Sequence, residues 1–174
     1  MPGLDGRISQ GWGGTPPDGV HVNVVLAERA SPTAAALTTA FASPGPGFAP
    51  ILISLGPDQP SYETLLPPTI MLNKIPTDSR ELESLVFGAC QVGVARGVLD
   101  AVAAELLAAD QETLVFVSLW IDASAGNEDA VCRAAREATS RAIAEAVQGR
   151  PSERARRLVD ERDSVTHPAY GGRA

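Results

Sequence analysis

Lysine, histidine and cysteine are all scarce in this sequence. One lysine, two histidines and two cysteines occur among 174 residues. The cysteines, Cys90 and Cys132, lie far apart and lack the short spacing of metal ligands, so no metal site is predicted, because a structural zinc ion needs four ligands. Both cysteines fall in apolar helical patterns, and we interpret them as core residues.

Long apolar runs and an excess of positive charge are missing as well. No uninterrupted apolar run approaches the ~20 residues of a membrane-spanning helix. The first 19 residues lack the basic and then apolar layout of a signal peptide. The net charge of −7 argues against nucleic acid or an anionic membrane as a partner, since both attract basic surfaces. We therefore expect a cytoplasmic protein with neither partner.

The composition is that of one soluble domain, with 44% hydrophobic and 20% charged residues. Residues 1–19 are rich in glycine and proline and show no period, which predicts a flexible N-terminal arm. The domain is expected over residues 20–149. Residues 150–174 form a charged C-terminal tail, which we expect to pack on the domain or on a neighbouring subunit.

Apolar periodicity within the domain predicts alternating strands and helices. Asp78 and Glu81 resemble a capping box at the start of the second helix. The most apolar strand, residues 113–121, is expected to be central. This order predicts an α+β single-domain two-layer sandwich, with the sheet covered mainly on one side. The predicted strands are 20–26, 50–55, 69–75 and 113–121, and the predicted helices are 31–42, 78–109 and 127–147.

Two polar side chains share one face of the first predicted strand. In VHVNVVL at 20–26, strand alternation places His21 and Asn23 opposite the valines. A histidine pKa near 6.5 suits acid–base chemistry, but a hydrogen-bonded histidine on a half-buried strand fits the pattern too. Lys74 is the only lysine in a chain that otherwise uses arginine, which suggests a need for an ammonium group; a surface lysine is the alternative.

Seven short motifs occur in an order and at spacings that are specific in combination, although no single motif is specific. Together they resemble the formaldehyde-activating enzymes from residue 20 to residue 169. The motifs are VHVNVVL at 20–26, Ser31-Pro32, Gly47-Phe48, Asn73-Lys74, FGACQ at 87–91, Glu137-Ala138-Thr139 and SVTHP at 164–168.

The resemblance implies a fold, an assembly and a reaction. The fold would be like the second domain of a small-subunit ribosomal protein, with a left-handed βαβ crossover. The chain would form a homopentamer, or a multiple of it, with the site between adjacent subunits. The reaction would be that of a hydro-lyase, which joins formaldehyde to the reduced pterin tetrahydromethanopterin. The pterin is a co-substrate, and no cofactor or metal is bound permanently.

The resemblance also assigns roles to individual residues. It makes His21 the catalytic general acid and predicts that five residues bind substrate. Asn23 stands where the family has a carboxylate, and Pro76 stands where it has a threonine, so both polar contacts are altered. Two alternatives therefore stay open: condensation of formaldehyde with a different amine, and a non-catalytic module that binds formaldehyde or a pterin. The predicted substrate-binding residues are Asn23, Leu52, Lys74, Pro76 and Gln91.

Overall fold

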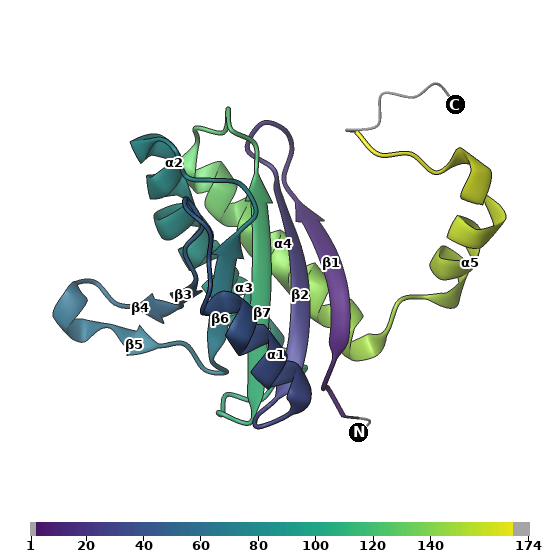
Figure 1. The fold of residues 1–174 in the computed structure, drawn as a ribbon, viewed down its shortest axis with the longest axis horizontal. Coiled ribbons are helices and arrows are strands. Elements are labelled where there is room, and N and C mark those ends of the chain that lie inside the picture. The colour runs from purple at the N-terminus through teal and green to yellow at the C-terminus, as the bar shows by residue number, and fades with distance from the viewer. Residues whose placement is uncertain (1–2, 169–174) are drawn as a thin grey trace.

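A five-stranded mixed sheet forms the centre of the computed structural model, which describes residues 3–168 (Figure 1). Its strand order is β1-β2-β7-β6-β3, so β7 is central, as predicted. The β6–β7 pair is parallel, and the other neighbouring pairs are antiparallel. The strands are β1 (Arg7–Gly13), β2 (Val20–Glu28), β3 (Ile51–Leu52), β6 (Thr69–Asn73) and β7 (Thr113–Ile121).

Helices cover the two faces of this sheet unequally (Figure 1). One face carries a continuous helical stretch and a long helix packed beside it, and among residues 3–168 the other face carries only the helix α1. The predicted single α+β domain is thereby confirmed. The helices are α1 (Pro32–Phe41), α2 (Arg80–Ser84), a π-helical segment (Leu85–Cys90), α3 (Gln91–Ala103) and α4 (Glu128–Gln148).

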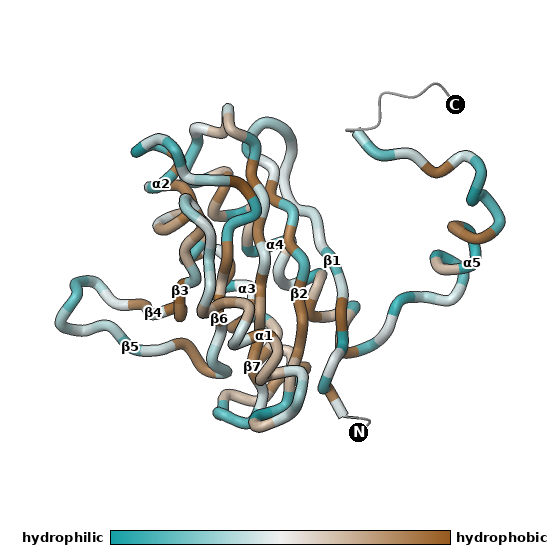
Figure 2. Tube along the Cα trace, viewed as in Figure 1, coloured by the Kyte–Doolittle hydropathy of each residue, from teal (hydrophilic) through white to brown (hydrophobic). Residues whose placement is uncertain are grey.

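The main core lies between the sheet and the α3–α4 layer. Alternate residues of β2, beginning with Val20, Val22 and Val24, are fully buried there. Hydrophobic residues recur along β2 and β7 in Figure 2. Burying a valine or leucine side chain contributes about 1.5–3 kcal/mol, so this alternation fixes which face of β2 meets the helices. His21 and Asn23 consequently lie on the face that α1 covers only in part.

The predicted flexible arm is wrong for residues 7–13, which form the edge strand β1. This strand pairs with β2 along its whole length. Its alternation is hidden in the sequence because the core-facing positions are small. A Cβ on Gly11 or Gly13 would overlap a backbone carbonyl oxygen of α4, so glycine is required where the helix crosses the strand.

Several predicted boundaries move. Ser79, not Asp78, caps α2 by accepting a hydrogen bond from the Leu82 amide. The helical stretch ends at Ala103 rather than at residue 109. The predicted strand 50–55 is interrupted at the buried Ile53, and its second half forms a separate hairpin, β4 (Ser54–Leu55) with β5 (Glu63–Thr64).

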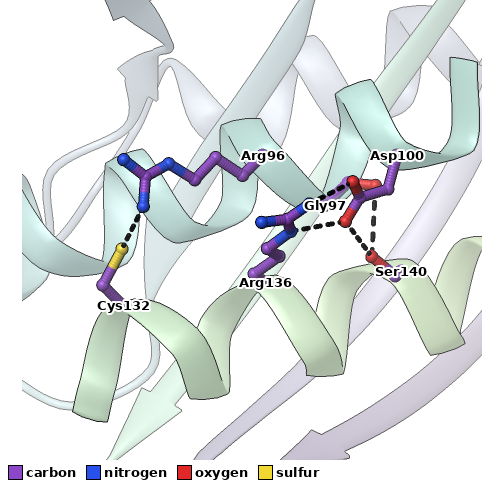
Figure 3. A network of polar contacts seen from close by, with 6 residues as sticks. All are labelled: Arg96, Gly97, Asp100, Cys132, Arg136 and Ser140. Atoms are coloured by element: carbon purple, nitrogen blue, oxygen red, sulfur yellow. Dashed lines mark hydrogen bonds and ion pairs between the residues drawn. The ribbon is translucent and has the colours of Figure 1, made fainter. Parts of the chain in front are cut away.

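Both cysteines lie in the α3–α4 layer, and both are free. Cys90 is buried, as predicted, and burial raises the pKa of its thiol. Cys132 is only partly buried, and its Sγ lies 3.7 Å from the Arg96 guanidinium (Figure 3). One turn further along, Arg136 and Asp100 form a two-pronged ion pair at 2.6 Å, so this polar row joins the outer edges of α3 and α4.

The C-terminal tail stands away from the sheet (Figure 1). It contains a helix that the sequence analysis missed, α5 (Ser152–Asp160), and every residue from 150 to 168 is exposed. Residues 150–168 meet their own domain through ion pairs of Arg150 and Arg154 with Glu145, and packing on a neighbouring subunit stays a prediction. Residues 169–174 lie outside the described residues.

One helical stretch, Arg80–Ala103, is long and apolar enough to cross a membrane by length and composition. Half of its most apolar window is buried inside the protein. Several of its apolar residues, including Val86, Val94 and Val98, belong to the main core. This stretch therefore has the character of a core helix.

Candidate active site

A row of polar and aromatic residues crosses the part of the sheet that α1 leaves open. The strand register sets His21 of β2 opposite Trp12 of β1 on one side and opposite Trp120 of β7 on the other. The next row places Asn23 opposite Gln10 in the same way. These five side chains share one face because the core-facing valines alternate with them.

Two side chains converge on His21 and Asn23, Gln10 from the neighbouring strand β1 and Lys74 from the end of β6. Lys74 Nζ lies 2.9 Å from His21 Nδ1, and it also donates to Asn23 Oδ1. On the other side of the ring, His21 Nε2 lies 3.1 Å from Gln10 Oε1. The structure therefore brings together three of the predicted site residues, His21, Asn23 and Lys74.

Lys74 owes its position to the end of β6. Its backbone amide donates to Leu119 O and so extends the pairing with β7. The preceding residue, Asn73, is buried on the opposite face, where its side chain donates to the carbonyls of Gly47 and Ile75. Strand alternation then directs the Lys74 side chain toward His21.

The hydrogen bonds assign one form of the His21 ring. An ammonium group only donates, so Nδ1 accepts from Lys74 and Nε2 carries the ring hydrogen, which it donates to Gln10. Burial lowers the pKa of His21, and the Lys74 ammonium lowers it further. Burial also lowers the pKa of Lys74. The imidazole is therefore neutral near pH 7 and has a proton donor behind it.

The other three predicted residues lie apart from this cluster within one chain. Leu52 is 51% exposed on β3, the far edge strand, where it pairs with Ile70. Pro76 is exposed beyond the end of β6. Gln91 begins α3 in the helical layer, and its Nε2 donates to Phe87 O at 2.8 Å.

Sequence reasoning missed three members of the site: Gln10, Trp12 and Trp120. Gln10 and Trp12 fell in the supposed arm, where the glycines conceal a strand. Trp120 lay in a predicted strand, where strand alternation would have placed it on the polar face, opposite the buried residues. Gln10 and Trp12 also border a cavity of about 520 Å³ between β1 and the end of α4.

No group of three or more His, Cys, Asp or Glu side chains in residues 3–168 is arranged to hold a metal ion. The site offers an imidazole N–H, an ammonium group and two amides on an open sheet face. Fold and site together define a small α+β protein whose open sheet face carries groups able to donate and accept protons.

The chain belongs to the formaldehyde-activating enzyme family, whose model matches residues 13–170. It is 32% identical to a protein of Methanosarcina barkeri named 5,6,7,8-tetrahydromethanopterin hydro-lyase, over 95% of this chain and 90% of that protein. It is 29% identical to a bifunctional enzyme Fae/Hps of Methanosphaera stadtmanae, of which the match covers 40%. These matches confirm the predicted family and the predicted enzyme type, a formaldehyde-activating carbon–oxygen lyase.

Proposed function

We propose that this protein condenses formaldehyde with a reduced pterin of the tetrahydromethanopterin type, with His21 as the general acid. The observation that carries the proposal is the position of His21 between Lys74 and Gln10 on the open sheet face. The name of the relative from Methanosarcina barkeri supports the choice of pterin. The products are the methylene adduct and water.

The slow step of such a condensation is the loss of water from the first adduct. An amine adds to formaldehyde and gives a carbinolamine, whose hydroxyl leaves as water only when a proton reaches it. His21 Nε2–H supplies this proton while Nδ1 takes one from Lys74, so the ring stays neutral throughout. The products of this step are an iminium ion, water and a neutral Lys74 amine. A positioned acid of this kind contributes about 100- to 10,000-fold to the rate.

The second nitrogen of the substrate then closes the ring and restores the site. It attacks the iminium carbon and loses its proton to His21 Nε2, while the Nδ1 proton returns to Lys74. In sum, formaldehyde and two N–H groups give one methylene bridge and one water. The lowered pKa of Lys74 favours the first transfer, because it makes the ammonium a better proton donor to Nδ1.

A different amine as the partner of formaldehyde is the second candidate, and Asn23 is the observation that favours it. Asn23 Oδ1 accepts from Lys74, so its acceptor atom is already engaged. A carboxylate at this position would accept substrate N–H groups more strongly. The amine for this site could therefore lack the N–H groups that the family carboxylate binds.

The test is formaldehyde consumption measured across several amines, including tetrahydromethanopterin. We expect His21→Ala to lower the enzymatic rate by about 100-fold or more. The matched control is His167→Ala, which alters the other histidine of the chain in the exposed tail. Equal rates for wild type and His21→Ala with every amine would sink the proposal. Binding of a pterin without turnover would instead establish the non-catalytic module.

We further propose a site shared between copies in a homopentamer or a multiple of it, in the cytoplasm. The support is that Leu52, Pro76 and Gln91 lie away from His21 within one chain, so a neighbouring copy would bring them to the substrate. For the fold, we infer the left-handed crossover of the ribosomal-protein type. Its support is the path from β6 to β7 through helices on the face opposite α1 (Figure 1).

A further inference from the structure

The two tryptophans of the chain flank His21. Trp12 and Trp120 lie on strands that are separated by β2. Neighbouring strands lie about 4.8 Å apart, so backbones two strands apart are separated by roughly 9.6 Å. The indole centroids are only 6.2 Å apart, at an interplanar angle of 33°. The two rings therefore lean toward each other across the His21 position.

Trp12 is held firmly although it is 38% exposed. Its Nε1 donates to Gly14 O at 2.9 Å. Its ring rests against Gly19, where a Cβ would overlap the indole. A glycine thus makes room for the ring, and a backbone carbonyl fixes its orientation. An indole that is both fixed and exposed beside a neutral imidazole has the character of a preformed contact surface.

We propose that Trp12 and Trp120 form the surface that binds a flat, π-bonded ring of the amine substrate and places its nucleophilic nitrogen beside His21. The inference rests on the proposed function and narrows its substrate class to amines that carry such a ring. Aromatic rings attract one another at centroid distances of 4.5–7 Å, beyond the gain from buried area.

The chemistry of the row favours a small molecule over a second copy of the chain as the occupant. On the sheet face that carries the indoles, Gln10 Oε1 and Lys74 Nζ are hydrogen-bonded to the two ring nitrogens of His21. A flat ring with N–H and C=O groups on its edge can stack on the indoles and hydrogen-bond to these polar groups. The apolar side chains of a docking protein would remove water from these polar groups without adding hydrogen bonds, which costs free energy.

The experiment compares two diamines of similar size that differ in the flatness of one group. N-benzylethylenediamine carries a flat ring, and N-(cyclohexylmethyl)ethylenediamine carries a saturated one; both form imidazolidines with formaldehyde. The measured quantity is the ratio of their kcat/KM values. Any difference in intrinsic reactivity cancels when this ratio is compared between wild type and variants.

We expect Trp12→Leu and Trp120→Leu each to lower the ratio by about three- to tenfold, mainly through a higher KM for the benzyl compound. Trp120→Phe keeps a flat ring and should retain most of the preference. The control is Ile8→Ala, which removes an exposed apolar side chain from the same face of β1 and should leave the ratio unchanged. Because both tryptophans lie at the site, indole fluorescence reports binding of the benzyl compound without formaldehyde.

Four outcomes are distinguishable. His21-dependent turnover with a lowered ratio supports the aromatic surface. His21-dependent turnover with an unchanged ratio overturns it and leaves the proposed function standing. If Trp12→Leu alters only the sedimentation coefficient and not the ratio, the indoles belong to an interface between copies, which overturns the inference as well. Turnover independent of His21 contradicts the proposed function itself.

Discussion

At the scale of single residues, the state of His21 is set by neighbours of different kinds. Lys74 donates to one ring nitrogen, and Gln10 accepts from the other. Both hydrogen-bond partners that the structure gives the Lys74 ammonium are neutral side chains, His21 and Asn23. The ammonium is therefore available to assist His21 rather than bound to a carboxylate.

The protonation of His21 predicts how stability depends on pH. The folded pKa lies below the ordinary value near 6.5. As the pH falls through about 6.5, the unfolded chain takes up a proton that the folded site resists, so the free energy of unfolding decreases. Wild type should therefore lose more stability than His21→Gln between pH 7.5 and pH 5.5.

Urea unfolding of the two proteins at both pH values measures this difference. His21→Gln keeps a polar side chain on the strand and lacks the titrating group. A stability difference between the two proteins that is the same at pH 5.5 and pH 7.5 would contradict a lowered pKa. A wild type that gains stability over the variant as the pH falls would show the opposite shift.

At the scale of elements, β1 decides how complete the site is, because it carries Gln10 and Trp12. The strand lies close to α4: Ser9 Oγ donates to Ala142 O, and Gly11 and Gly13 lie directly against helix carbonyls. Small residues on one face of β1 thus let the other face present its polar and aromatic side chains beside β2.

Gly11→Ala tests this contact. The added methyl group has no space beside the Ala138 carbonyl, so β1 or α4 must shift, and we expect the free energy of unfolding to fall by about 1–3 kcal/mol. The matched control is Gly88→Ala in the helical stretch, where a Cβ meets nothing within 4 Å. That change should be neutral or slightly stabilising. Chemical denaturation of both variants checks the pair, and equal destabilisation would refute the close contact.

The elements that sequence reasoning found are those whose buried residues are large. Val20, Val22 and Val24 made β2 evident, and the apolar run at 113–121 made β7 evident with its observed bounds. Alternation then placed His21 and Asn23 on one face correctly. β1 was missed because glycine at Gly11 and Gly13 carries no hydrophobic signal. The requirement for glycine comes from α4, more than 100 residues away, and no local pattern reports it.

The members of the site were likewise only partly predictable from the sequence. Lys74 was singled out by its rarity and by the family resemblance, but only the end of β6 shows why it reaches His21. Gln10 could not be found without β1. The capping residue of α2 moved by one position because Ser79 and Asp78 are both good caps, and backbone geometry chooses between them.

At the scale of the whole molecule, the tail is the part that the single chain does not explain. α5 buries nothing, and its apolar residues Leu158 and Val159 are 47% and 63% exposed. Its ties to the domain are ion pairs of Arg150 and Arg154 with Glu145. The Arg154 side chain is 62% exposed, so the pair that α5 itself makes contributes little to stability, typically about 0–1 kcal/mol. We propose that α5 packs on a neighbouring copy.

This proposal predicts that Leu158→Asp combined with Val159→Asp weakens self-association of the full chain without unfolding it. Burying these side chains at an interface is favourable, and buried carboxylates would be costly. Sedimentation over a range of protein concentrations should show the double variant dissociating at concentrations at least about tenfold higher than wild type. Circular dichroism should remain that of the wild type, because the domain core is untouched.

Glu153→Ala, an exposed change on the same helix, is the control and should sediment as the wild type does. Identical sedimentation of all three proteins would mean that α5 does not pack on a second copy. The exposed Leu158 and Val159 would then need a different binding partner.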